Sequence, residues 1–156
     1  MRLRVLRLLA LTESPWAYGS TLEWEEDLGE AEWRRRMDPS NGPRLWAVDD
    51  TSGTDEDVGL AGSFTDPDQA QVVHLVAMWV APSHRGRGIG ELLVEAFVRD
   101  AAARGWEAVE LRVVDTNVGA WRLYERCGFT PTGETYSHLG DEAVRDVVMQ
   151  RMLRHD

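Results

Sequence analysis

The fold of this 156-residue chain is decided by the stretch Val80-Ala81-Pro82-Ser83-His84-Arg85-Gly86-Arg87-Gly88-Ile89-Gly90-Glu91-Leu92-Leu93. An apolar segment predicted as a strand, residues 72–80, precedes the turn, and an apolar stripe at helical spacing follows over residues 88–103. Three alternate glycines let the backbone approach a ligand closely, and amide N–H groups at a helix start attract phosphate. We therefore predict that residues 85–90 bind a phosphate or pyrophosphate, with Arg85 and Arg87 adding positive charge from the side.

Two common phosphate-binding loops do not match this turn. A Walker A loop is excluded because no Lys-Ser/Thr pair follows the glycines. A dinucleotide-binding turn is excluded because its third glycine would fall at position 91, which is Glu91. A glycine-rich turn can also simply connect two elements, so the surrounding sequence has to decide between a ligand site and a structural turn.

The remaining periodicity predicts one α/β domain over residues 1–156. Beyond the strand and helix already given, we expect helices at 2–13, 28–37 and 117–126, a hairpin of 45–48 with 58–64 around an acidic loop at 49–57, and strands at 106–114, 129–136 and 144–153. From residue 72 onward strands alternate with helices, which requires a parallel pair in the middle of a mixed sheet.

Two blocks of this sequence resemble the GNAT superfamily of N-acetyltransferases. Arg85 to Gly90 matches that family's Arg/Gln-x-x-Gly-x-Gly/Ala motif, and a second block is similar to its Asn-x-x-Ala-x-x-Leu-Tyr-x-x-x-Gly-Phe motif: Asn117-Val118-Gly119-Ala120-Trp121-Arg122-Leu123-Tyr124-Glu125-Arg126-Cys127-Gly128-Phe129. Residues 14–21 give a weaker third match. The family usually opens with a strand before its first helix, so either that strand is absent here or residues 2–13 form it.

The resemblance implies a GNAT-like fold and acetyl-CoA as cofactor. The fold would be a mixed, twisted sheet with an antiparallel start and a central splayed parallel strand pair, flanked by helices. The pyrophosphate of coenzyme A would lie on the turn formed by Arg85, Gly86, Arg87, Gly88, Ile89 and Gly90. The pantetheine arm would pair with the backbone of Met78 and Val80, and Asn117 would lie beside the cofactor while capping the helix that follows.

Three side chains are candidates for catalysis. The resemblance makes Tyr124 the proton donor to the departing thiolate, although it can also be a core aromatic residue. His74 takes a position where some family members carry a basic glutamate, and the alternative is a hydrogen-bonded histidine at the sheet surface. Glu23 is a further candidate base or amine anchor. Cys127 reads as a small apolar residue near a helix end rather than an acyl carrier.

The predicted activity is direct acetyl transfer from acetyl-CoA to a primary amine within a ternary complex; the alternative is a non-catalytic acyl-CoA sensor. A net charge of −10 argues against binding nucleic acid or an anionic membrane. Acids between residues 21 and 32 hint at a cationic acceptor, but a polyamine, an amino acid, an aminoglycoside-like drug and a protein N-terminus all stay open. No metal site is predicted, a homodimer is one possible assembly, and a single cysteine fits a cytoplasmic location.

Overall fold

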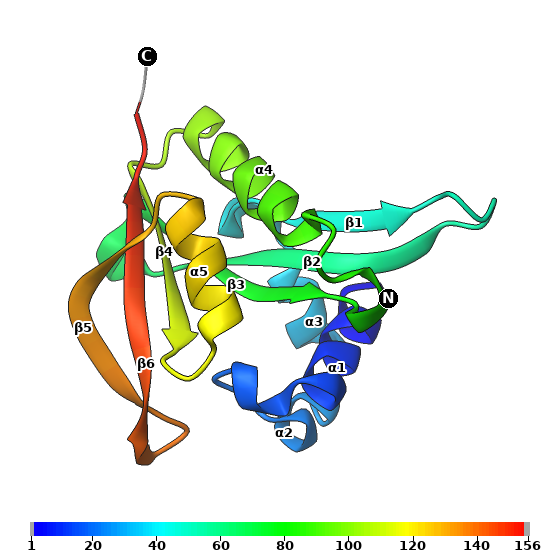
Figure 1. Cartoon of the computed structure of the whole chain (residues 1–156), viewed down its shortest axis with the longest axis horizontal. Helices are drawn as coiled ribbons and strands as arrows, with labels where there is room; N and C mark the ends of the chain where they lie inside the picture. The colour runs from blue at the N-terminus through cyan, green and yellow to red at the C-terminus, as the bar shows by residue number, and fades with distance from the viewer. Residues whose placement is uncertain (1, 155–156) are drawn as a thin grey trace.

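The computed structural model describes residues 2–154, which form one mixed sheet with helices on both faces (Figure 1). The six strands lie in the order β1-β2-β3-β4-β6-β5, and β3 with β4 is the parallel pair while the other neighbours are antiparallel. The strands are β1 (Leu45–Asp49), β2 (Glu56–Thr65), β3 (Val72–Val80), β4 (Ala108–Val114), β5 (Thr130–His138) and β6 (Asp141–Met152). This arrangement confirms the predicted fold class.

One face of the sheet is covered by the helices that follow β3 and β4. The α-helices are α1 (Arg2–Glu13), α2 (Leu22–Glu26), α3 (Glu30–Arg36), α4 (Ile89–Ala103) and α5 (Val118–Arg126). The main core lies between α4, α5 and the sheet, where Phe97 and Phe129 are almost fully buried. Within residues 2–154 no helix is long and apolar enough to cross a membrane.

The N-terminal helices cover part of the opposite face. Leu6 of α1 and Trp33 of α3 pack against Leu60 of β2 and Trp79 of β3 in a second, smaller core. These helices lie below one end of the sheet in Figure 1, away from β5 and β6. Residues of β4, β5 and β6 line a cavity in the structure.

Most predicted elements occur in the structure with small shifts at their ends. Residues 2–13 form helix α1, as predicted, so these residues are not a strand. The helix predicted at 28–37 is shorter, and α2 precedes it, capped by the Thr21 hydroxyl, which accepts a hydrogen bond from the Trp24 amide. A helix of five residues is too short to give a recognisable period.

Candidate active site

The two parallel strands separate soon after they pair. β3 is paired with β4 only from Val72 to His74, although both strands continue beyond that point. Beyond this paired stretch, the register of β3 against β2 shifts: Leu60 pairs with Trp79, whereas Gly62 pairs with Val76. One extra residue is thereby accommodated in β3, and Ala77 adopts a left-handed conformation with φ 55°. This bulge turns β3 away from β4 and opens a gap in the middle of the sheet.

The gap exposes one edge of the β3 backbone. The Ala81 amide bonds to the Val58 carbonyl of β2 at 2.8 Å, and alternation along a strand then directs the backbone groups of Met78 and Val80 to the opposite edge. Both carbonyls accept side-chain hydrogen bonds there: Met78 from the Tyr18 hydroxyl at 2.9 Å, and Val80 from Arg85 Nε at 2.9 Å. The edge predicted to bind an extended ligand is therefore accessible to side chains rather than paired with β4.

The glycine turn lies at the end of this gap. Gly86 and Gly88 have φ values of 75° and 79°, and a Cβ atom at either position would meet no atom within 4 Å. Their left-handed conformation favours glycine, and the space beside them is free for a ligand. Gly90 is different: a Cβ there would lie 3.1 Å from Leu123 of α5, so its absence lets the two helices approach closely.

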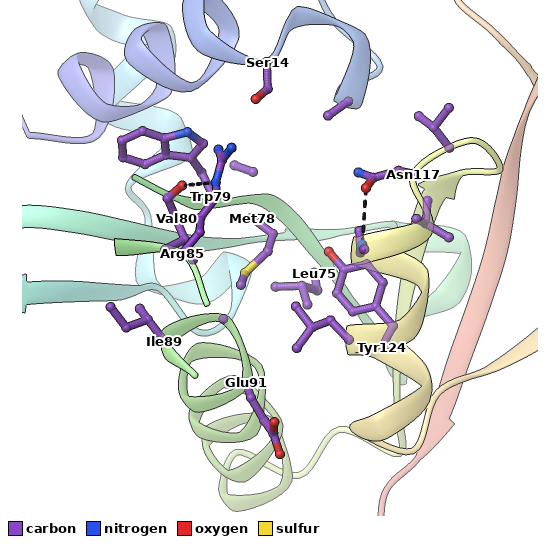
Figure 2. Close-up of a pocket in the computed structure, with 18 of the residues that line it drawn as sticks. Ser14, Leu75, Met78, Trp79, Val80, Arg85, Ile89, Glu91, Asn117 and Tyr124 are labelled. Carbon is purple, nitrogen blue, oxygen red and sulfur yellow. Dashed lines mark hydrogen bonds between the residues drawn. The ribbon is translucent and has the colours of Figure 1, made fainter. Parts of the chain in front are cut away.

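A cavity of about 470 Å³ joins the turn, the gap and the start of α5. Met78, Val80, Asn117 and Tyr124 all line this cofactor cavity, as do residues of the turn (Figure 2). The structure thus brings together nearly all of the predicted cofactor-binding residues. Arg87 is the exception, since its side chain is exposed and does not line the cavity.

Arg85 is engaged with the end of α1. Its guanidinium lies 2.6 and 3.1 Å from the two carboxylate oxygens of Glu13, which also accepts a hydrogen bond from Trp79 Nε1 at 3.2 Å. The hydrogen bond from Arg85 is the main cause of a lowered pKa at the Glu13 carboxyl. In this structure the Arg85 side chain therefore connects α1 to β3, and its contact with a phosphate stays a prediction.

Tyr124 lies on α5 and Asn117 caps the start of that helix, and both line the cavity together with the turn. Tyr124 is only 7% exposed, and burial raises the pKa of its hydroxyl well above the ordinary value. Figure 2 shows its ring facing Met78. The Asn117 side chain accepts a hydrogen bond from the Ala120 amide at 3.2 Å, which confirms the predicted helix cap. A neutral phenol in this place can donate a proton to a group at the centre of the cavity.

A second cavity of about 920 Å³ adjoins the first, and we name it the acceptor cavity. The two cavities share Tyr18, Arg112 and five apolar residues, Ala17, Leu75, Val76, Ala77 and Val114, which we name the junction. A ligand in the acceptor cavity can therefore reach a group bound along β3. Trp16 lines the cofactor cavity and Trp24 the acceptor cavity.

His74 lines the acceptor cavity but not the cofactor cavity. Its Nε2 atom lies 3.1 Å from Gln69 Oε1, and its Nδ1 atom lies 3.8 Å from a carboxylate oxygen of Glu110. Burial lowers the pKa of His74, while the nearby Glu110 carboxylate opposes that shift. Burial therefore favours the neutral imidazole, which is the form that can accept a proton.

The structure does not bring Glu23 to either cavity. Glu23 is exposed on α2, and its role as a base or anchor stays a prediction without geometric support. The buried acid of this segment is Glu25, which is bonded to Arg7 at 2.8 Å and to Arg36 at 3.2 Å. Because arginines neutralise this acid, the acidic composition of residues 21–32 is a poor guide to the acceptor's charge.

Cys127 is buried at the C-terminal end of α5, and burial raises the pKa of its thiol to about 11. A thiol with that pKa is a weak nucleophile at neutral pH.

Three residues that the sequence did not single out line the acceptor cavity: Tyr18 and Arg112 at the junction, and Glu110 beside His74. Sequence alone offers a weak signal for them, because each is an ordinary polar residue whose position depends on which strands are neighbours.

Comparisons with known proteins agree with this geometry. The sequence model of the acetyltransferase (GNAT) family matches residues 5–129. A streptothricin acetyltransferase of Escherichia coli is 33% identical over 90 residues, a match that covers 51% of this chain and 52% of that protein. The chain thus spans about half the length of that curated relative.

Solved structures of the same fold are also similar. A GCN5-related N-acetyltransferase from Kribbella flavida is 27% identical, with a TM-score of 0.72 over 95% of this chain and 89% of that one. The yncA protein of Salmonella typhimurium, solved with its cofactor acetyl-CoA, is 18% identical, with a TM-score of 0.73 over 99% of this chain and 88% of that one. The fold of the chain is the fold of these proteins.

Proposed function

This chain belongs to the acetyltransferase (GNAT) family, and we propose that it is an N-acetyltransferase that moves an acetyl group from acetyl-CoA to a primary amine. One observation carries the proposal. A glycine turn, an opened β3–β4 gap and a buried tyrosine line one cavity, and this cavity joins a second one large enough for an acceptor. A sensor that only binds acyl-CoA would not need the second cavity.

The residues present fit acetyl-CoA. Gly86 and Gly88 leave open space at the start of a 15-residue helix, where amide groups and the helix dipole favour a pyrophosphate. The free backbone edge at Met78 and Val80 suits the amide groups of pantetheine, which can pair with it as an added strand would. Each of these carbonyls already accepts one side-chain hydrogen bond, and a carbonyl oxygen has a second lone pair for another.

The chemistry is a direct transfer in a ternary complex. When bound, acetyl-CoA supplies the acetyl group as a thioester. His74 accepts the proton of the acceptor nitrogen, through water, as that nitrogen bonds to the thioester carbon. The Val80 amide stabilises the negative charge that develops on the carbonyl oxygen. As the carbon–sulfur bond breaks, Tyr124 donates its proton to the thiolate, so that free coenzyme A and an N-acetyl product leave.

A thiol-release assay tests the proposal. The purified protein is mixed with acetyl-CoA and a panel of amines, and free coenzyme A is measured over time. We expect at least one amine to increase thiol release well above the rate with acetyl-CoA alone. Calorimetry with coenzyme A separates the alternatives: binding without any amine-dependent release would support a sensor, and absence of binding would reject both functions.

A further inference from the structure

Arg112 carries the only charge at the junction between the two cavities, within the part of the chain that the structure describes. The other side chains there are apolar or, for Tyr18, neutral with a pKa raised to about 12 by burial. An acceptor amine has to reach the junction in order to meet the thioester. The groups attached to the same carbon as that amine therefore come close to the Arg112 guanidinium.

The guanidinium of Arg112 is oriented toward the acceptor side. Its central carbon lies 4.0 Å from the centre of the Tyr136 ring, and Tyr136 lines the acceptor cavity but not the cofactor cavity. Stacking on a ring holds the guanidinium plane but uses none of its N–H donors. Among residues 2–154, no carboxylate forms an ion pair with Arg112. A fork of donors is thus positioned for a carboxylate that the protein itself does not supply.

Three large apolar side chains are exposed in the acceptor cavity beyond the junction, among a lining that is otherwise mostly polar. Trp24, Phe64 and Leu139 are 56%, 50% and 53% exposed, and all three line this cavity. Exposed apolar side chains gathered around a cavity indicate a ligand with apolar surface. Three of the acids that line this cavity have protein partners: Glu25 and Glu32 are paired with arginines, and Asp146 is hydrogen-bonded to His138.

We propose that the acceptor is an α-amino acid with an apolar side chain, and that Arg112 binds its carboxylate. In such a molecule the carboxylate and the amine share one carbon, so Arg112 can hold the former while the latter lies at the junction. The side chain then contacts the exposed apolar residues of the acceptor cavity, Trp24, Phe64 and Leu139. This inference rests on the proposed acetyltransferase function and adds the substrate class to it.

The test compares three chemical forms of each of three amino acids: the acid, the amide and the decarboxylated amine. L-Leucine, L-methionine and L-phenylalanine are each assayed beside their amides and their decarboxylated amines, with kcat/KM from thiol release and Kd from calorimetry in the presence of coenzyme A. The Kd values are independent of differences in amine reactivity. Wild-type protein is expected to favour the acid over both analogues by roughly tenfold to hundredfold, the range for a charge-assisted hydrogen-bonded pair.

Substitutions at Arg112 provide the second arm. Arg112→Gln is expected to lower the preference for the acid to near unity, mainly through KM, while Arg112→Lys keeps the charge and gives an intermediate ratio. Arg99→Gln removes an exposed arginine of α4 that lines neither cavity, and its ratio should match that of the wild type. An unchanged Tm in thermal unfolding of all variants shows that the fold is intact.

Several results would contradict the proposed substrate class and leave the proposed acetyltransferase function unaffected. One is thiol release with the amines or amides at the same efficiency as with the acids. Another is turnover of unrelated amines only, with no amino acid of the panel being a substrate. An unchanged acid preference in Arg112→Gln would reject the role of that side chain. Failure of coenzyme A to bind would instead reject the acetyltransferase function, and this proposal with it.

Discussion

Replacing Gly88 by alanine tests the phosphate seat against a matched control. Gly88 has φ 79°, and Gly105, at the far end of α4, has φ 92°. A Cβ added at either position meets no atom within 4 Å, so neither substitution creates a clash. Only Gly88 lies in the cofactor cavity. The two variants therefore share the same backbone penalty and differ in what the new methyl group faces.

The expected magnitudes follow from the backbone penalty, which both variants share, and from the loss of a phosphate contact, which is expected only at Gly88. Alanine in a left-handed conformation costs about 1–2 kcal/mol, so both variants should lose that much unfolding free energy. For a domain of this size the loss lowers Tm by about 2–8 °C. A methyl group over the seat of Gly88 also displaces a phosphate oxygen from an amide, and a hydrogen bond to a charged group contributes about 1.5–3 kcal/mol. Gly88→Ala should thus raise the Kd for coenzyme A roughly tenfold to hundredfold.

Thermal unfolding measures the loss of stability, and calorimetry on the same samples measures the Kd for coenzyme A. Gly105→Ala should show the drop in Tm with an unchanged Kd, and Gly88→Ala should show both effects. If both variants bind coenzyme A as tightly as the wild type, then the turn does not hold the pyrophosphate. The reasoning from open space and positive φ would be refuted by that result.

Three further changes test other parts of the site and fold. Tyr124→Phe should lower kcat by roughly 10²–10⁴-fold with little change in coenzyme A affinity, since general acid catalysis contributes about that factor; an unchanged kcat would reject the acid role. Burial keeps the pKa of His74 below 6.5, so kcat/KM should rise with pH as His74 loses its proton and level off by neutral pH. His74→Gln should abolish that acid limb, and a limb that persists would point to another base. Glu25→Gln should cost about 3–5 kcal/mol of unfolding free energy in chemical denaturation, because Arg7 is then buried without its partner; the exposed Glu30→Gln serves as the control, within about 0.5 kcal/mol of wild type.

The sequence alone was sufficient to predict the strand–turn–helix unit around Arg85 to Gly90 and the helix that carries Tyr124. Both are local: the period of apolar residues specifies the elements, and glycines specify a turn with positive φ. A cap such as Asn117 acts within three residues, so it too can be read from the sequence. The predicted cofactor residues therefore lie together in the structure, apart from the exposed Arg87.

Only the tertiary structure decided the acceptor side of the site. His74 and Glu110 become neighbours because β3 pairs in parallel with β4, a contact between residues 36 positions apart in the sequence (110 minus 74). The acids between residues 21 and 32 suggested a cationic acceptor, yet Glu25 is neutralised by Arg7 from α1 and Arg36 from α3. Charge is a property of the sequence, but which charges remain available to a ligand depends on the pairs that folding forms.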